Sequence, residues 1–273
     1  MTKTYAVIGD PIDHSLSPAI HNAAFGFLGM DCAYIAYRIP KGELASGIEA
    51  LKKIQISGFN VTIPHKVDMI KFLDEADENC TTIGATNTVV NNDGFLKGYN
   101  TDMDGFLDPI KKRNIDCKDS DVLLVGAGGA ARAIVVGFAK EKVRRITIAN
   151  RTKERADELI KFANSLEVQS DYSDLSNAGE IAGKYKFIVN ATSMGLKGNM
   201  CPISTRTITK DSIVYDIVYM PVETELIEQS KKQGATIIYG WEMLLGQAMR
   251  SFEIWTGRQA PYQAMKLTLL GRF

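Results

Sequence analysis

The stretch Val122-Leu123-Leu124-Val125-Gly126-Ala127-Gly128-Gly129-Ala130-Ala131-Arg132-Ala133 decides the fold of this chain. Its apolar start predicts a buried strand, and its alanine-rich end predicts a helix that begins at a glycine-rich turn. The turn matches G-x-G-x-x-A, in which the glycines allow a tight turn and the approach of a pyrophosphate, while the small third residue allows close helix packing. We therefore expect dinucleotide binding rather than a purely structural turn, at Gly126, Ala127, Gly128, Gly129 and Ala130.

The residues after the next apolar run, 145–149, indicate which dinucleotide is bound. A site that prefers NAD usually carries Asp or Glu there to hold the ribose 2′-hydroxyl, whereas this chain has Asn150, Arg151, Thr152 and Arg155. An arginine attracts a 2′-phosphate and can bind it through its planar fork. A solvated basic helix start is the alternative, but the helix dipole disfavours cations at that position. The sequence therefore predicts NADP.

Composition and length limit the possible classes of protein. The 273 residues suffice for two domains, and 32 basic residues balance 32 acidic ones, which gives no indication of a nucleic-acid or anionic membrane partner. The four cysteines form no C-x-x-C pair, so neither a disulfide framework nor a zinc site is indicated. The apolar run near the N-terminus is too short for a signal peptide, and no apolar run reaches the roughly 18 residues that a membrane helix needs. We expect a soluble, cytoplasmic protein with a small-molecule substrate.

Strand and helix patterns alternate along the chain, which predicts an α/β fold. We expect an N-terminal α/β substrate domain, a doubly wound Rossmann-type dinucleotide-binding domain and a cleft between them. The pattern also predicts a helical run over 67–76, a strand over 83–90, and a helix that begins at Pro221 and ends at Gly234.

Polar side chains gather where the N-terminal strands are expected to end. Asn60, Thr62 and Lys66 follow one apolar run, and Asn87 and Asp102 accompany the next two. Because ligands of open α/β sheets bind at the carboxyl ends of strands, these residues are candidates for a site. A lone Lys is also typical of a solvated surface, and a lone Asp is typical of a helix N-cap.

Two further features near the N-terminus have structural alternatives. Ser15 and Ser17 precede Pro18, which suits the first turn of a helix, so one of the two hydroxyls is expected to be an N-cap. His14 and His21 lack a third ligand at suitable spacing, so we expect no metal site.

Seven blocks in this order resemble the shikimate dehydrogenase family, and the resemblance extends from Gly9 to the C-terminal helices. The blocks are His14-Ser15-Leu16-Ser17-Pro18, Asn60-Val61-Thr62-Ile63-Pro64-His65-Lys66, Gly84-Ala85-Thr86-Asn87-Thr88, Asn100-Thr101-Asp102, Gly126-Ala127-Gly128-Gly129-Ala130, Asn150-Arg151-Thr152 and Gln247-Ala248. One departure is Met103, which stands where many members of the family carry Gly.

The resemblance implies a role for each candidate residue. Lys66 and Asp102 match the catalytic pair of the family. The residues implied to bind the substrate are Ser15, Ser17 and Tyr219 at its carboxylate and Asn60, Thr62, Asn87 and Gln247 at its hydroxyls. Those implied to bind the cofactor are Gly126 to Ala130 at the pyrophosphate, Asn150, Arg151, Thr152 and Arg155 at the 2′-phosphate, and Met194 and Gly240 near the nicotinamide.

The resemblance further implies NADPH-dependent, reversible reduction of 3-dehydroshikimate to shikimate, a step of aromatic amino-acid biosynthesis through chorismate. It implies a substrate-binding catalytic domain of residues 1–102 and 240–273, an NADP-binding Rossmann domain of residues 103–239, and a monomer or homodimer.

Three alternatives remain open. A quinate/shikimate dehydrogenase of dual specificity often prefers NAD, which Arg151 disfavours. A methylenetetrahydrofolate-type dehydrogenase does not suit the serine pair. A non-catalytic NADP-binding sensor would not require both Lys66 and Asp102.

Overall fold

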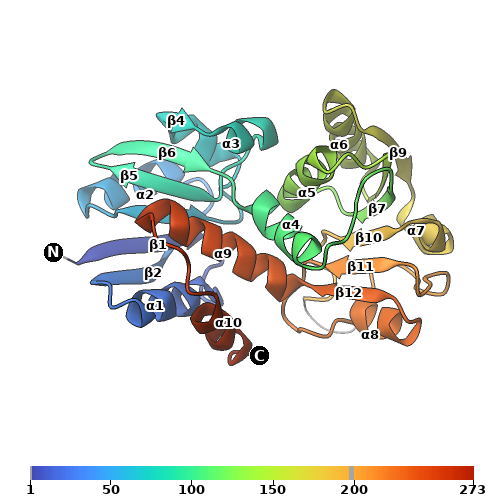
Figure 1. Ribbon diagram of the computed structural model, residues 1–273. Coiled ribbons are helices and arrows are strands. Elements are labelled where there is room, and N and C mark those ends of the chain that lie inside the picture. The colour runs from blue at the N-terminus through green and yellow to red at the C-terminus, as the bar shows by residue number, and fades with distance from the viewer. Residues whose placement is uncertain (1, 197–199) are drawn as a thin grey trace. The chain divides into compact units, whose positions relative to one another are not determined.

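A computed structural model describes residues 2–196 and 200–273 of the chain. The chain divides into two compact units (Figure 1). Unit 1 contains residues 1–102 and 245–272, and unit 2 contains residues 103–244 and 273. Helix α9 (Gly240–Thr256) begins in unit 2 and ends in unit 1. The chain thus leaves unit 1 after Asp102 and returns to it near its C-terminal end.

Unit 1 contains a mixed six-stranded sheet in the order β2-β1-β3-β5-β6-β4. Its strands are β1 (Lys3–Gly9), β2 (Cys32–Arg38), β3 (Gly58–Val61), β4 (Glu75–Ala76), β5 (Thr88–Asn92) and β6 (Phe95–Tyr99). Strand β1 is parallel to β2 and β3, whereas β5 is antiparallel to β3 and β6. The carboxyl end of β3 therefore lies beside the start of β5 and the end of β6, which brings three of the predicted polar blocks together.

Both faces of this sheet are covered by apolar side chains. The helical segments of unit 1, besides α9, are α1 (Ser17–Phe27), α2 (Leu44–Lys53), the 3₁₀ helix η1 (Asp68–Phe72), α3 (Glu78–Ile83) and α10 (Tyr262–Leu270). On one face Ile8 and Phe59 pack with Ile48 of α2. On the other face the ring of Tyr5 lies 5.5 Å from Phe25 and 5.0 Å from Trp255. Each such buried side chain contributes about 1.5–3 kcal/mol of transfer free energy.

Two predicted elements of unit 1 are wrong. The run 67–76 is not one helix, because Leu73 is extended and Glu75–Ala76 pairs with β6, so backbone pairing overrides the local pattern. The predicted strand 83–90 begins only at Thr88, because α3 occupies the residues up to Ile83. The carboxylate of Asp77 caps α3 by accepting from Cys80 N at 2.7 Å.

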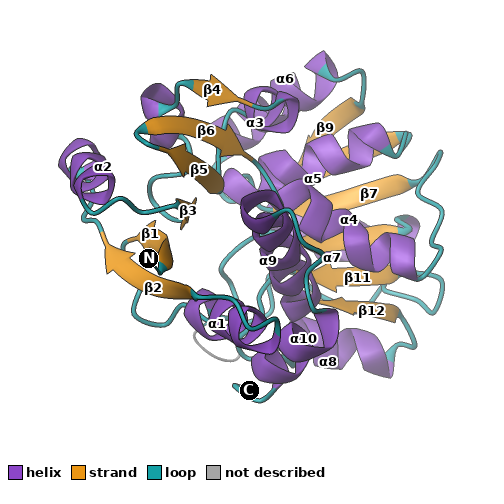
Figure 2. Cartoon of the chain, turned by 60° about the vertical axis from the view of Figure 1, so that its left-hand side comes forward, coloured by secondary structure: helices purple, strands orange, loops and turns teal. Residues whose placement is uncertain are grey.

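Unit 2 contains a parallel six-stranded sheet in the order β12-β11-β10-β7-β8-β9. Figure 2 shows β9, β7, β11 and β12 in this sequence across the sheet. The strands are β7 (Asp121–Val125), β8 (Arg145–Ala149), β9 (Gln169–Ser173), β10 (Phe187–Asn190), β11 (Ile213–Asp216) and β12 (Thr236–Tyr239). This is the strand order of a doubly wound dinucleotide-binding fold, as predicted, and the chain order reverses between β7 and β10.

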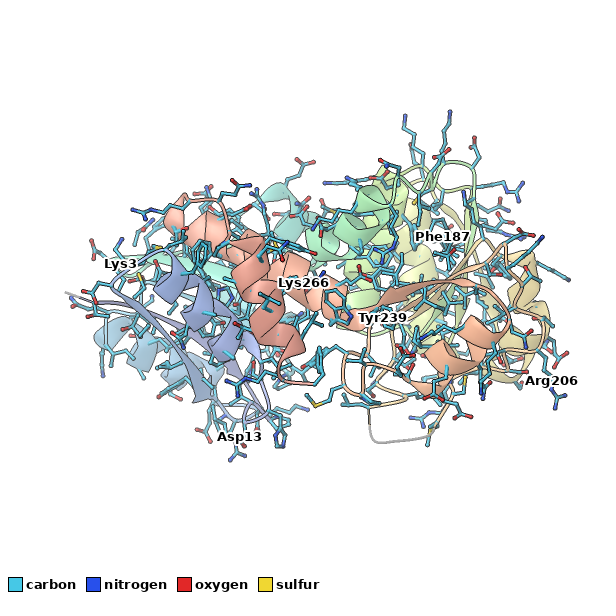
Figure 3. The ribbon with its side chains drawn as sticks, turned by 60° about the horizontal axis from the view of Figure 1, so that its bottom comes forward. Lys3, Asp13, Phe187, Arg206, Tyr239 and Lys266 are labelled. Carbon is cyan, nitrogen blue, oxygen red and sulfur yellow. The ribbon has the colours of Figure 1, made fainter. Side chains whose placement is uncertain are left out.

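Alternate residues of the strands of unit 2 face opposite layers of helices. The helices are α4 (Asp102–Lys112), α5 (Gly129–Lys140), α6 (Lys153–Ser165), α7 (Leu175–Ile181), the 3₁₀ helix η2 (Ala182–Lys184) and α8 (Glu225–Lys232). Leu123 and Ile188 pack with residues of α7 and α8. Phe187, labelled in Figure 3, packs instead on Phe138 of α5 with ring centroids 5.3 Å apart. This alternation leaves the sheet buried on both faces, as parallel sheets require.

The helix that was predicted to begin at Pro221 begins at Glu225 instead. The Thr224 hydroxyl caps it by accepting from Ile227 N at 3.3 Å and donates to Asp216 Oδ2 at 2.7 Å. A side-chain cap thus defines the helix start more strongly than the proline does. Within residues 2–196 and 200–273, no helix combines the length and the apolar character needed to cross a membrane.

Candidate active site

A lysine–aspartate pair lies beyond the carboxyl ends of β3 and β6 in unit 1. Lys66 Nζ donates to Asp102 Oδ2 at 2.5 Å, and the two side chains are 21% and 9% exposed. Lys66 follows β3 through a turn, and its carbonyl accepts from Thr86 N at 2.9 Å. Asp102 is the first residue of α4. The pair is accessible enough for a ligand to reach and buried enough for its charges to act strongly.

Asn87 fixes the second oxygen of that carboxylate. Its Nδ2 donates to Asp102 Oδ1 at 2.8 Å and to Thr101 Oγ1 at 3.0 Å, while its Oδ1 accepts from Thr101 N at 2.8 Å. Both oxygens of Asp102 therefore have donors within the chain. Asn87 contacts the predicted catalytic pair directly, and its role as a ligand of a substrate hydroxyl remains a prediction.

Asn60 has more partners within the chain than the sequence suggested. Its Oδ1 accepts from the Tyr34 hydroxyl at 2.6 Å, and its Nδ2 donates to Asn87 O at 2.9 Å and to Ser251 Oγ at 3.1 Å. The residue is only 6% exposed. Burial raises the pKa of Tyr34 well above its ordinary value, and a hydrogen bond from Ser17 partly opposes this shift. The Asn60 amide therefore supports its neighbours, and its contact with substrate stays a prediction.

Three buried hydroxyl groups complete this network. Ser251 Oγ lies 2.8 Å from Thr88 Oγ1 and 3.2 Å from Thr101 Oγ1, and it also donates to Gln247 O at 2.9 Å. Gln247 lies one turn before Ser251 on α9, and it is half-buried. The network therefore links the helix that carries Gln247 to the asparagines beside Asp102.

Three further predicted substrate residues lie in unit 1: Ser15 and Ser17 come after β1, and Thr62 directly follows β3. Ser17 N donates to Ser15 Oγ at 3.4 Å, and Ser17 begins α1 without a side-chain cap at its N-cap residue, Leu16. The expected N-cap role is therefore not filled by either serine hydroxyl. Half-buried Thr62 donates its N–H to Ile8 O at 2.9 Å, which places it beside the end of β1.

His14 and His21, the two histidines near the N-terminus, lie in different environments. His21 is fully buried and stacks on Tyr34 at 4.5 Å, and burial lowers the pKa of His21 to about 3. Neither ring nitrogen of His21 has a hydrogen-bond partner among the described residues. His14 is exposed. In the described part of the chain, no three His, Cys, Asp or Glu side chains are grouped so that they could hold a metal ion.

The glycine turn of unit 2 follows β7 and opens into α5. Gly126 has φ +106°, and a Cβ there would lie 2.8 Å from Thr192 Cγ2, so the turn itself requires this glycine. At Gly128 and Gly129 an added Cβ would meet no atom of residues 2–196 and 200–273 within 4 Å, and the φ of Gly128 is −97°. The fold alone does not require these two glycines. Their open, exposed backbone fits the close approach of a pyrophosphate at the N-terminus of α5.

Cationic side chains follow β8, the strand next to β7. Arg151 and Arg155 are exposed, and neither has an ion-pair partner among residues 2–196 and 200–273. By contrast, Lys153 pairs with Asp157 at 2.8 Å. The Asn150 Nδ2 donates to Thr152 O at 2.8 Å, which shapes the turn. Two arginines that are not neutralised by carboxylates follow β8 and can bind a phosphate. No acidic residue occupies the position from which it would bind a ribose 2′-hydroxyl.

The loops after β10 and β11 are joined by Asp216. This carboxylate accepts from Asn190 Nδ2 at 2.9 Å and from Val218 N at 3.0 Å, and burial raises the pKa of Asp216. The loop after β10 carries Met194, whose N–H donates to Thr192 Oγ1 at 3.1 Å. Tyr219 follows β11, and burial raises its pKa.

Gly240 starts α9 against that second loop. A Cβ at Gly240 would lie 2.5 Å from Ile217 O, so only glycine permits this approach. The predicted nicotinamide and carboxylate residues of unit 2 are thus held at the carboxyl edge of its sheet.

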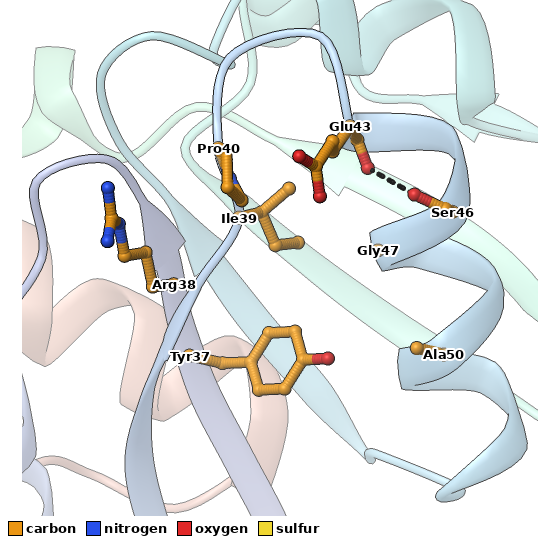
Figure 4. Close-up of a pocket in the computed structure, with 8 residues that line it drawn as sticks. All are labelled: Tyr37, Arg38, Ile39, Pro40, Glu43, Ser46, Gly47 and Ala50. Carbon is orange, nitrogen blue, oxygen red and sulfur yellow. Dashed lines mark hydrogen bonds between the residues drawn. The ribbon is translucent and has the colours of Figure 1, made fainter.

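A pocket of about 250 Å³ lies elsewhere in unit 1, between the end of β2 and α2 (Figure 4). It is lined by Tyr37, Arg38, Ile39, Pro40, Glu43, Ser46, Gly47 and Ala50, none of which is a predicted site residue. The carbonyl of Ile39, one of the lining residues, accepts from His65 Nε2, next to Lys66, at 2.7 Å. We do not assign the reaction to this pocket.

Protein-family models match most of the chain. The model described as "Shikimate dehydrogenase substrate binding domain" matches residues 7–89, and "Shikimate / quinate 5-dehydrogenase" matches residues 109–210. The model "Shikimate 5'-dehydrogenase C-terminal domain" matches residues 240–270. A protein of Nitrosopumilus maritimus (strain SCM1) named shikimate dehydrogenase (NADP(+)) is 63% identical over 273 residues, 100% of both chains. The chain belongs to the shikimate dehydrogenase family.

Solved structures of shikimate dehydrogenases and their relatives share the fold. A shikimate dehydrogenase in complex with NADP+ has a TM-score of 0.93 at 37% identity, over 99% of this chain and 96% of that chain. A quinate dehydrogenase from Corynebacterium glutamicum in complex with NAD has a TM-score of 0.92 at 29% identity, over 99% of both chains. Since both cofactors occur on this fold, the residues after β8 carry the argument for NADP.

Several residues of the network were missed by sequence reasoning. Thr88 and Thr101 stand inside blocks that were singled out, directly beside Asn87 and Asp102. Ser251 is four residues after Gln247, so helical spacing alone would place it on the same face. Tyr34 lies in an apolar strand, and no local pattern distinguishes it from a core tyrosine.

Proposed function

We propose that this chain catalyses the NADP-dependent, reversible interconversion of 3-dehydroshikimate and shikimate. The observation that carries the proposal is the Lys66–Asp102 pair at 2.5 Å, in which Asn87 donates to the carboxylate. The same chain carries a glycine turn at the start of α5 that suits a dinucleotide. We assign substrate binding and catalysis to residues 1–102 and 240–273 and cofactor binding to residues 103–239.

The chemistry of ketone reduction explains the choice of residues. NADPH, held by the glycine turn from Gly126 to Ala130 and by Arg151, would supply the hydride that reduces the carbonyl carbon. As negative charge develops on the carbonyl oxygen, the ammonium of Lys66 stabilises it and donates a proton to it. Asp102 orients Lys66 or relays the proton to it. In the oxidation of shikimate the same groups act in reverse, with Lys66 accepting the hydroxyl proton.

The binding roles follow from the chemistry of each group. The hydroxyls of Ser15 and Ser17 donate to the substrate carboxylate, together with Tyr219. Asn60, Thr62, Asn87 and Gln247 hold the ring hydroxyls. The open turn at Gly128 and Gly129 receives the pyrophosphate, and Arg151 and Arg155, with Asn150 and Thr152, receive the 2′-phosphate. Met194 and Gly240 lie near the nicotinamide.

The direct test follows NADPH consumption by absorbance after addition of 3-dehydroshikimate. We expect rapid consumption that depends on both compounds. If NADPH binds but is not consumed, the sensor alternative is favoured and the proposal fails. The cytoplasmic location and the monomeric or homodimeric state remain predictions.

A further inference from the structure

We propose that Tyr34 and Ser251 are positioning residues that orient Asp102 through the amide of Asn60. This inference rests on the proposed function, because it assigns these two residues to the reaction of Lys66 and Asp102. Neither residue contacts Lys66 or Asp102 directly. Both act on Asn60, from opposite ends of its amide.

Tyr34 determines which way the Asn60 amide faces. An asparagine side chain has two ends of similar shape, and its orientation follows from the donors and acceptors around it. The Tyr34 hydroxyl donates to Asn60 Oδ1 at 2.6 Å, so the amide nitrogen must face the opposite side, toward Asn87 O and the hydroxyls. Without the Tyr34 hydroxyl, rotation of the Asn60 amide by about 180° would no longer cost the hydrogen bond to Oδ1.

Ser251 holds the nitrogen end of the same amide. Its hydroxyl accepts from Asn60 Nδ2 at 3.1 Å and lies 2.8 Å from Thr88 Oγ1. Thr88 Oγ1 in turn donates to Asn87 Oδ1 at 3.0 Å. Asn60 also donates to the backbone carbonyl of Asn87. The side chain of Asn87 is therefore held by Thr88 and its backbone by Asn60. Asn87 Nδ2 in turn donates to Asp102 Oδ1.

The surroundings make this network rigid. Tyr34 and Ser251 are 2% and 0% exposed. The Tyr34 ring stacks on His21 with an interplanar angle of 9° and packs on Trp255, whose Nε1 donates to Val89 O at 2.9 Å. In such an environment each unmet donor or acceptor is costly, so the hydrogen bonds and the surrounding packing together hold these side chains in place. That arrangement presents Asp102 to Lys66.

The chain contains two matched controls. Tyr215 and Ser230 are also fully buried, and within the described residues their hydroxyls have no hydrogen-bond partner. Tyr34→Phe and Tyr215→Phe each remove one buried phenol hydroxyl, and Ser251→Ala and Ser230→Ala each remove one buried serine hydroxyl. Only the first member of each pair removes a contact to Asn60.

The experiment measures kcat for shikimate oxidation, KM for NADP+ and the urea unfolding midpoint of all four variants and of the double variant Y34F/S251A. We expect kcat to fall about tenfold in Tyr34→Phe and several-fold in Ser251→Ala, with the KM for NADP+ unchanged. The controls should keep kcat within about twofold of the unsubstituted chain. Because both substitutions act on one amide, the double variant should lose less than the product of the two single losses.

The outcomes separate the inference from the proposed function. If Tyr34→Phe and Tyr215→Phe have equal kcat, or if the two single losses multiply in the double variant, the positioning role is overturned while the activity stands. If the unsubstituted chain does not oxidise shikimate with NADP+, the proposed function and this inference both fall. A loss of kcat that only follows the unfolding midpoint, in all four variants alike, would also overturn the positioning role.

Discussion

Lys66 Nζ and Asp102 Oδ2 lie 2.5 Å apart, although 36 positions separate the two residues in the sequence. The geometry results from the pairing of strands: β3 delivers Lys66, and β6 runs antiparallel to β5 and delivers Asp102 at the start of α4. Asn87, at the start of β5 between these two strands, donates to the other oxygen of Asp102. The centre of the site is therefore a consequence of sheet topology.

Removal of either member of this pair should abolish most of the activity. We expect kcat to fall by about 10²–10⁴ in Lys66→Ala and in Asp102→Asn, because each removes a participant in proton transfer. Initial rates with shikimate and NADP+ measure the effect. Lys97→Ala, which breaks the Lys97–Glu75 ion pair of 2.6 Å in the same unit, is the control and should keep near-normal rates. Normal turnover in Lys66→Ala would refute its assigned role.

Arginine replacement should change the preference for the cofactor. In Arg151→Gln and Arg155→Gln we expect the KM for NADP+ to rise about tenfold or more, since each loses a hydrogen bond to a charged group, with little change in the KM for NAD+. Arg206→Gln removes another exposed arginine of unit 2 and serves as the control (Figure 3). Equal effects on the two cofactors would be inconsistent with 2′-phosphate binding.

Gly126 and Gly128, the two glycines of the G-x-G-x-x-A turn, should respond differently to substitution. Gly126→Ala places a Cβ 2.8 Å from Thr192 at φ +106°, so we expect the free energy of unfolding to fall by more than about 1 kcal/mol. The added Cβ of Gly128→Ala meets no atom of the described residues within 4 Å, so stability should be unchanged while the KM for NADP+ rises. Denaturant unfolding and steady-state rates distinguish the two. A destabilised Gly128→Ala with normal cofactor binding would show that this glycine is structural.

Burial of His21 should make the protein acid-sensitive. Its pKa is lowered from 6.5 to about 3, so the unfolded chain binds a proton between these values and the native protein does not. Unfolding free energy should therefore fall as the pH falls below about 6.5, by about 2 kcal/mol at pH 5. His21→Phe keeps a ring against Tyr34 and should reduce this slope, whereas His14→Gln should not. The same slope in His21→Phe and the unsubstituted chain would exclude His21 as the cause.

The sequence predicted the parts of the molecule that depend on local pattern. Gly126 to Ala130 and the arginines after β8 occupy the strand-to-helix context that their spacing indicated. Lys66, Asn87 and Asp102 meet because polar residues at parallel and antiparallel strand ends share one edge.

The rest of the site depends on contacts between distant segments. Tyr34 and Ser251 join the network across 26 and 191 positions of the chain, so no window of sequence shows their partners. The run 67–76 was misassigned for a similar reason, because pairing of Glu75–Ala76 with β6 cannot be seen locally. Asn60 was taken only as a substrate ligand because its four partners within the chain come from three other segments.

The most direct test of the account is a single crossed assay of initial rates, in which shikimate or quinate is combined with NADP+ or NAD+ and formation of reduced nicotinamide is followed by absorbance. The account predicts strong activity with shikimate and NADP+, and weak activity in the other three combinations. Comparable rates with quinate or with NAD+ would contradict the assigned specificity and the role of Arg151. No activity in any combination, with NADP+ still bound, would contradict the account as a whole.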